Sequence, residues 1–262
     1  GSIGQRHSIN LNNLGVSTRI VDIDEIQNID NILKNNFDLG LICTPNINHI
    51  EHCLKLAEHN LPIFCEKPFY TNTEEISTLL TIIKEKKLIT MVGCNLRFTP
   101  EINQINSDSK YINVYFGYDL KKWRPKTNHL DSYSANKHLG GGILLDAIHE
   151  LDYLYFKFGN IKNVSYIKNK LTNITNDVED IVIGRIEFEN DTIADFTLNY
   201  LSEEYQRYYD VLENGVLKRT NLELDNQMYI EEIKYFIDHV KNNTPCMNSF
   251  EEAHILLNHI IQ

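Results

Sequence analysis

The sequence predicts an α/β protein with two domains: a doubly wound parallel sheet, then an α/β domain with a largely antiparallel, open sheet. Two observations support this prediction. The first 95 residues alternate short apolar runs with helical patterns, which is typical of βαβ units. After residue 95 most strand-like runs follow one another, with few helices between them. The predicted domains are therefore residues 1–95 and 96–262.

In the first region, three apolar runs are bounded by polar or turn residues, as expected for buried parallel strands. They cover residues 39–43, 61–65 and 88–92. Between them, apolar residues recur at helical spacing over 50–57 and 76–83.

The second region contains several runs that alternate apolar and polar residues, many of them β-branched or aromatic. One long helix is expected within this region, and two more near the end of the chain. The expected strands are 111–119, 164–168, 178–188, 192–200 and 205–212, and the expected helices are 142–158, 229–241 and 249–261.

Composition excludes several functional classes. The net charge of −11 over 262 residues argues against binding to nucleic acid or to anionic membranes. No run of about 18 apolar residues is present, so no membrane-spanning helix is expected. The five cysteines contain no C-x-x-C pair and indicate free thiols in a reducing cytoplasm. The histidines lack metal-ligand spacing, so no metal site is expected.

Two motifs point to ligand binding in the first region. Gly1-Ser2-Ile3-Gly4 has the spacing that ends a glycine-rich phosphate loop, where backbone N–H groups meet a pyrophosphate. Alone it is weak, because two glycines in four residues are common and Gly-Ser is also a frequent cloning remnant. Thr44-Pro45-Asn46 with His49 follows a predicted strand, either as part of a ligand site or as an ordinary βα turn.

Glu66-Lys67-Pro68 also follows a predicted buried strand directly. A charged pair there is costly unless it is bonded to another group, and the carboxyl ends of parallel strands are where doubly wound sheets bind ligands. The alternative is a solvated surface turn. The position favours a functional role.

The most informative stretch is Gly140-Gly-Gly142 followed by Asp146 and His149. Three glycines permit a sharp turn or a close backbone approach. On one helix, Asp146 and His149 would lie on the same face at i and i+3, where a carboxylate can orient an imidazole for acid–base catalysis. The alternative is a glycine turn before a helix whose Asp and His face water. Motifs of serine hydrolases, P-loop proteins and zinc proteases do not occur.

The order of these motifs resembles the Gfo/Idh/MocA oxidoreductases over nearly the whole chain. The resemblance implies a Rossmann domain and a C-terminal α/β domain whose open sheet often forms oligomer interfaces, here a homo-dimer or homo-tetramer. It implies hydride transfer between NAD or NADP and a sugar or nucleotide sugar. The segment 133–153 is similar to members of bacterial surface-glycan pathways. The motifs are Gly-x-x-Gly-x-Arg-His, Thr-Pro-Asn-x-x-His, Glu-Lys-Pro, Asn95-Leu-Arg97-Phe, Trp123-Arg124 and Gly-Gly-Gly-x-x-x-Asp-x-x-His.

The resemblance also implies roles for particular residues. Lys67, before a proline that is typically cis in this family, would stabilise a developing alkoxide. His149 would take the hydroxyl proton while Asp146 orients its imidazole, and such acid–base catalysis contributes roughly 10²–10⁴ in rate. The implied cofactor-binding residues are Gly1, Ser2, Ile3, Gly4, Thr44, Pro45, Asn46, His49, Glu66, Arg97, Trp123 and Arg124.

Departures from the family pattern leave alternatives open. Many members space the Asp and His four residues apart, whereas here the interval is three. The first fingerprint glycine and the strand before it are missing, so we expect that the natural protein is longer than 262 residues. The acidic residue that selects NAD cannot be located, and Arg19 could instead meet a 2′-phosphate. The alternative functions are an NAD-dependent glycosidase and a non-catalytic sensor of dinucleotide and sugar.

Overall fold

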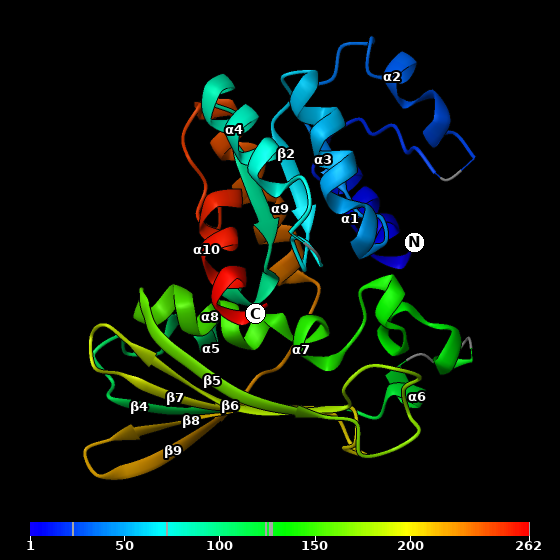
Figure 1. The fold of residues 1–262 in the computed structure, drawn as a ribbon. Coiled ribbons are helices and arrows are strands. Elements are labelled where there is room, and N and C mark those ends of the chain that lie inside the picture. The colour runs from blue at the N-terminus through cyan, green and yellow to red at the C-terminus, as the bar shows by residue number, and fades with distance from the viewer. Residues whose placement is uncertain (23, 72, 124, 126–127, 262) are drawn as a thin grey trace. The chain divides into compact units, whose positions relative to one another are not determined.

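A computed structural model describes residues 1–22, 24–71, 73–123, 125 and 128–261. The chain forms two compact units (Figure 1). The first contains Gly1–Asn95 and Asn226–His254, and the second contains Leu96–Asp225 and Ile255–Gln262. The division thus differs from the predicted one, because a late segment of the chain belongs to the first unit.

The first unit is built on a three-stranded parallel sheet in the order β1-β2-β3, and its described residues form five α-helices and the start of a sixth. The predicted strands at 39–43, 61–65 and 88–92 are confirmed, each one to two residues shorter or shifted. The elements are α1 (Ser2–Asn13), α2 (Ile29–Ile32), β1 (Gly40–Ile42), α3 (His49–Glu58), β2 (Ile63–Glu66), α4 (Ile76–Lys86), β3 (Thr90–Gly93), α9 (Gln227–Asn242) and the beginning of α10 (Phe250–Ile260).

Helices cover both faces of this sheet. Phe64, in the middle strand β2, meets the ring of His7 from α1 at 5.4 Å and the ring of Phe236 from α9 at 5.7 Å. Side chains alternate along a strand, so the neighbouring residues of β2 face the opposite layer, where α3 packs on β1 and β2. Phe64 and Phe236 are almost completely buried, and this packing explains why α9 belongs with the first unit.

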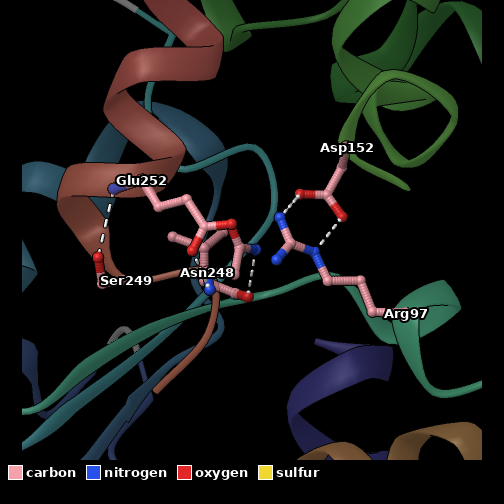
Figure 2. Close-up of polar contacts among 6 residues, drawn as sticks. Arg97, Asp152, Asn248, Ser249 and Glu252 are labelled. Atoms are coloured by element: carbon pink, nitrogen blue, oxygen red, sulfur yellow. Dashed lines mark hydrogen bonds and ion pairs between the residues drawn. The ribbon is translucent and has the colours of Figure 1, made fainter. Parts of the chain in front are cut away.

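The segment before α10 is tied to β3 of the same unit. The Val92 N–H donates to the Asn248 carbonyl, and the Asn248 side-chain amide donates to the Val92 carbonyl at 2.8 Å. Ser249 and Glu252 cap the start of α10: the Glu252 N–H donates to Ser249 Oγ, and the Glu252 carboxylate accepts from the Asn248 N–H at 2.7 Å (Figure 2). These bonds fix the chain as it enters the helix.

The second unit has a six-stranded sheet in the order β5-β6-β7-β4-β8-β9. β4 and β7 are parallel and all other pairs are antiparallel. The five predicted strands are confirmed, and β9 is an additional one. Helices α5, α7 and α8 lie on one face of the sheet (Figure 1). The elements are β4 (Tyr111–Gly117), β5 (Ile161–Asn169), β6 (Ile181–Phe188), β7 (Ile193–Asn199), β8 (Gln206–Glu213), β9 (Val216–Asn221), α5 (Pro100–Asn103), α6 (Leu120–Trp123), α7 (Ile143–Asp146) and α8 (Ile148–Phe158).

The predicted single helix over 142–158 is wrong. It is divided at Ala147, whose φ of −100° and ψ of 30° end α7 before α8 begins. Asp146 is therefore the last residue of α7 and His149 is the second residue of α8. Among the described residues, no helix is both long and apolar enough to cross a membrane.

Candidate active site

The N-terminus of α1 has the features expected of a phosphate-binding turn. Gly1 precedes the helix, so the N–H groups of Ser2 and Ile3 belong to its first turn, where a helix supplies no partners of its own. A Cβ added at Gly4 would lie 3.3 Å from the Cβ of Cys43, at the end of β1. Gly4 therefore allows close packing of helix on strand, as the third glycine of a dinucleotide fingerprint does.

His49 joins the loops that follow β1 and β2. Its Nδ1 lies 2.8 Å from the Pro68 carbonyl and its Nε2 lies 3.0 Å from the Thr44 carbonyl. The ring is completely buried, and burial lowers its pKa despite the two carbonyls. His49 therefore holds these two loops together, and its predicted contact with a cofactor stays a prediction. Between them, Asn46 lines a hollow of about 340 Å³.

Glu66 and Lys67 lie at the carboxyl end of the middle strand, as predicted. His7 Nε2 and Glu66 Oε1 are 2.6 Å apart, and the Lys67 N–H donates to Glu66 Oε2 at 3.3 Å. The Lys67–Pro68 peptide bond is cis, as the family resemblance predicts. Lys67 is partly exposed. The first unit thus brings Gly4, Thr44, Asn46, Glu66 and Lys67 to the same edge of its sheet.

Sequence reasoning missed two members of this group. His7 is in the quoted motif but received no role, and Glu232 of α9 was not considered. With Glu66 they offer ligand atoms that all lie within 4.8 Å of one another. The 2.6 Å between His7 Nε2 and Glu66 Oε1 is a hydrogen bond, shorter than the roughly 2.9–3.3 Å between ligand atoms around a metal such as zinc. His7 and Glu66 are therefore better described as a hydrogen-bonded pair.

In the second unit, Asp146 is held by a tyrosine that sequence reasoning also missed. Tyr200 is fully buried and its hydroxyl donates to Asp146 Oδ2 at 2.7 Å. Burial, followed by the charge of Asp146, raises the pKa of Tyr200 well above its ordinary value. The phenol therefore stays protonated and remains a donor at alkaline pH. The Trp123 ring lies 6.1 Å from the Tyr200 ring, so Trp123 borders the same region.

The glycines before α7 allow the backbone to pack closely against neighbouring groups in the segment that leads to Asp146. A Cβ at Gly141 would lie 2.1 Å from the Tyr133 carbonyl oxygen, and Gly142 has a φ of +112° with the Glu179 carboxylate directly beside it. Glu179 also accepts from the Leu144 N–H at 3.2 Å at the start of α7. Within this unit, the glycines permit a close-packed entry into the helix that ends at Asp146.

Arg97 forms a buried ion pair. Its Nε and Nη2 donate to the two carboxylate oxygens of Asp152, both at 2.8 Å (Figure 2). Arg97 is only 2% exposed, so its guanidinium serves the packing of the second unit, and its predicted contact with a cofactor stays a prediction. Arg124, predicted beside it, lies outside the described residues. Arg19 pairs with Glu25 on the surface of the first unit.

Comparisons with known proteins agree with this arrangement. The family model "Oxidoreductase family, NAD-binding Rossmann fold" matches residues 4–94, and the model "GFO/IDH/MocA C-terminal domain" matches residues 110–218. These matches and the two sheets confirm the predicted α/β class, and they confirm an NAD-binding Rossmann domain in the first unit.

Individual relatives are more distant. The chain is 29% identical to an inositol 2-dehydrogenase of Rhizobium meliloti over 139 residues, 52% of this chain and 41% of that protein. It is 24% identical to a 2,7-anhydro-N-acetylneuraminate hydratase of Mediterraneibacter gnavus over 145 residues, 54% of this chain and 39% of that protein. The chain thus matches less than half the length of these relatives.

A solved structure extends the likeness of fold to almost the whole chain. It is the scyllo-inositol dehydrogenase of Lactobacillus casei with bound NAD(H) and scyllo-inositol. The TM-score is 0.75 at 17% identity, and the match covers 98% of this chain and 91% of that chain.

Proposed function

Because the chain belongs to the Gfo/Idh/MocA family, we propose that it is an NAD(P)-dependent dehydrogenase or reductase acting on a carbon of a sugar or nucleotide sugar. The observation that carries the proposal is the position of Glu66 and Lys67. They follow the middle strand of a parallel sheet at its ligand-binding edge, in a unit that matches an NAD-binding family model. The family's inositol and sugar dehydrogenases support the substrate class.

The first unit would hold the cofactor. The N–H groups of Ser2 and Ile3 would donate to the pyrophosphate at the start of α1, and Gly4 lets the helix pack closely enough for that approach. Thr44, Pro45 and Asn46 would lie along the dinucleotide, with Glu66 beside the nicotinamide ribose. When bound, the nicotinamide supplies the hydride acceptor or donor.

The side chains of both units would then handle charge and protons. In the oxidative direction, His149 takes the hydroxyl proton and Asp146 orients the imidazole, while Tyr200 fixes the Asp146 carboxylate. The Lys67 ammonium stabilises the alkoxide that develops at the reacting carbon. In the reductive direction the same groups return the proton.

The proposal extends to a nucleotide-sugar substrate of bacterial surface-glycan biosynthesis, on the resemblance of residues 133–153. It also places the enzyme in the cytoplasm, supported by five free cysteines, of which four are buried. The open face of the six-stranded sheet is proposed to join copies of the chain into a dimer or tetramer.

A second candidate is an enzyme of the same superfamily with no net redox turnover, such as an NAD-dependent glycosidase. One observation favours it: a relative that matches 54% of this chain is named as a hydratase rather than as a dehydrogenase. Such an enzyme would retain its cofactor and convert substrate without accumulating the reduced form.

The test begins with cofactor binding and continues with Lys67. Fluorescence titration with NADH and NADPH should show binding of at least one of them. Lys67→Ala should lower kcat by roughly 10²-fold or more while changing the cofactor Kd less than about threefold, because the ammonium acts on developing charge. A Lys67→Arg variant serves as the matched control for the positive charge.

Each outcome separates the candidates. Full activity in Lys67→Ala would remove the residue from the mechanism, and binding of neither dinucleotide would contradict the oxidoreductase proposal. Binding without turnover of any tested substrate would favour a sensor. Substrate conversion with no net change in NADH absorbance would favour the second candidate.

A further inference from the structure

Two consecutive acidic residues, Glu179 and Asp180, contact both sides of the hydrogen bond between Asp146 and Tyr200. They lie between β5 and β6. Glu179 binds the start of α7, the short helix that ends at Asp146. Asp180 binds the backbone of Tyr200. All four residues belong to the second unit, so one segment of this unit holds both partners of the bond.

Glu179 is bonded twice to the start of α7. Its Oε1 accepts from the Leu144 N–H at 3.2 Å, and its main-chain carbonyl accepts from the Ile143 N–H at 3.4 Å. The first N–H groups of a helix have no partner inside that helix, so these bonds satisfy two of them. Because α7 is only four residues long, Asp146 lies within one turn of both bonds. The position of Glu179 is therefore transmitted to the Asp146 carboxylate.

The last of the three glycines makes room for the Glu179 carboxylate. Gly142 has a φ of +112°, and a Cβ added to it would collide with the Glu179 carboxylate. A side chain at position 142 would displace that carboxylate from the Leu144 N–H. Gly142 and Glu179 thus form one arrangement at the start of α7.

Asp180 fixes the other end of this arrangement. It is fully buried, and its carboxylate accepts from the Leu171 N–H, the Thr172 N–H and the Thr172 hydroxyl, each at 2.8 Å. Its N–H donates to the Asn169 carbonyl at 3.0 Å, and its carbonyl accepts from the Tyr200 N–H at 2.9 Å. The segment is therefore anchored to β5 on one side and to the residue after β7 on the other.

The charge of Glu179 does not explain its position. Burial is the largest cause that raises the pKa of Glu179, backbone N–H groups lower it, and the charge of Asp146 raises it again. Two neighbouring carboxylates repel each other, so Glu179 does not help Asp146 to carry its charge. What Glu179 contributes is an acceptor for the backbone of α7, and a neutral amide oxygen supplies the same acceptor.

We propose that Glu179 is a positioning residue that holds α7 so that Asp146 meets Tyr200. The inference rests on the proposed function, in which Asp146 orients the catalytic imidazole. Without the acceptor at position 179, the start of α7 loses a bond, and the Asp146 carboxylate is no longer held against the phenol. Tyr200 itself stays in place, because Asp180 continues to bind its backbone.

The test is a double-mutant cycle read by urea unfolding, which needs no substrate. Tyr200→Phe lowers the urea midpoint of the wild type by a measured shift. In the Glu179→Ala background, the same change should produce less than about half of that shift, because the hydroxyl has already lost its partner. Glu179→Gln keeps a carbonyl oxygen for the Leu144 N–H, so in that background the shift should be restored to about the wild-type size.

Glu187→Ala is the matched control. Glu187 is half-buried on β6 of the same unit, and its carboxylate makes no hydrogen bond among the residues that the structure describes. In this background Tyr200→Phe should produce the full wild-type shift. If Glu179→Ala does not fold, as judged by circular dichroism, the same cycle is measured with Glu179→Asp, whose side chain is one methylene too short to reach the Leu144 N–H.

Turnover provides a second readout, with NAD⁺ and either scyllo-inositol or UDP-glucose as probes. Glu179→Ala should lower kcat by about tenfold or more and change KM by less than about threefold, because a misplaced Asp146 affects the chemical step. The Kd for NADH should stay within about twofold of the wild-type value, and Glu179→Gln should recover most of the lost kcat.

The outcomes distinguish this inference from the proposed function. Equal midpoint shifts in Glu179→Ala and in the wild type, or an undiminished kcat in Glu179→Ala, would overturn the role of Glu179 and leave the oxidoreductase proposal intact. Failure of the folded wild type to bind NADH or NADPH would instead contradict the proposed function. If the wild type turns over neither probe, the cycle alone decides. A reduced shift that Glu179→Gln restores would support the inference.

Discussion

Asp146 receives its hydrogen bond from Tyr200, which lies at the end of a strand far along the chain. The bond joins α7 to the residue after β7, both within the second unit. A buried carboxylate that accepts from a phenol is held in one orientation, which is what a partner of a catalytic imidazole needs. The contact therefore links the packing of the sheet to the proposed chemistry.

The first prediction concerns this hydroxyl. Tyr200→Phe should lower the free energy of unfolding by about 1–3 kcal/mol, because a buried hydrogen bond to a charged group is lost. It should lower kcat about tenfold and leave the Kd for NADH within twofold, because the cofactor is bound in the other unit. Urea unfolding and steady-state kinetics measure these effects.

Tyr153→Phe is the matched control. Tyr153 is also fully buried in the second unit, and its hydroxyl has no hydrogen-bond partner among the residues that the structure describes. Its removal should change kcat less than twofold. Equal losses of kcat in the two variants would show that Tyr200 acts only through packing.

The positions of individual candidate residues were predictable where the sequence signal is local. Glu66 and Lys67 were found because a charged pair directly after an apolar strand is unusual. Tyr200 gave no such signal, because an aromatic residue at the end of a strand is ordinary core composition. Glu232 gave no signal either, because the residues near it, His7 of α1 and Glu66 of β2, lie far from it in the sequence.

At the scale of elements, the strands were predictable and the break in the helix was not. β2 and β3 are buried at every position, β1 is half-buried or buried, and all three therefore appear as continuous apolar runs. β9 was missed because most of its residues are exposed and it lacks a clear alternation. Ala147 is a good helix former, so its residue type gives no signal of the division at this point.

The domain assignment of α9 shows the same limit. The apolar face of an amphipathic helix predicts that the helix packs against another element, but it does not indicate which sheet that element belongs to. Phe236 reaches Phe64, and this pairing places α9 with residues more than 100 positions earlier in the chain. Which sheet the helix packs on depends on how the side chains of the two elements fit together, and the hydrophobic periodicity of the helix carries no information about that fit.

The loops after β1 and β2 provide a prediction about pH. Burial lowers the pKa of His49, so the folded state holds this ring neutral more strongly than the unfolded state does. The stabilisation is complete above the unfolded pKa of about 6.5 and is lost progressively as the pH falls below that value. The wild type should therefore lose stability between pH 7 and pH 5.

His49→Gln isolates this contribution. The variant should be less stable at pH 7, because the bonds to Thr44 and Pro68 are disturbed, but its stability should decline less on acidification. Urea unfolding at pH 7, 6 and 5 gives the comparison, with the exposed His138→Gln as control. A constant difference between wild type and His49→Gln at all three values would contradict this account.

At the scale of the whole molecule, one face of the six-stranded sheet carries an ordered pattern of aromatic and charged side chains. Tyr115 and Tyr208 stack across β4 and β8 at 5.1 Å, and Arg219 lies 3.6 Å over the Tyr208 ring. Ile167 and Ile183 are 62% and 46% exposed on neighbouring strands. Tyrosine, arginine and exposed apolar residues are characteristic of protein interfaces.

The last prediction tests whether this face joins copies of the chain. Ile183→Asp places a charge in the middle of the face, where it would be desolvated on association, and should convert a dimer or tetramer to monomers at micromolar concentration. Light scattering coupled to size-exclusion chromatography measures the mass. Ile255→Asp is the matched control, because Ile255 is equally exposed, at 47%, but lies on α10. Its mass should equal that of the wild type. A wild type that is monomeric at every concentration, or equal dissociation by both variants, would contradict assembly through this sheet face. Dissociation by Ile183→Asp alone would establish that the second unit associates through the face of the sheet opposite the helices.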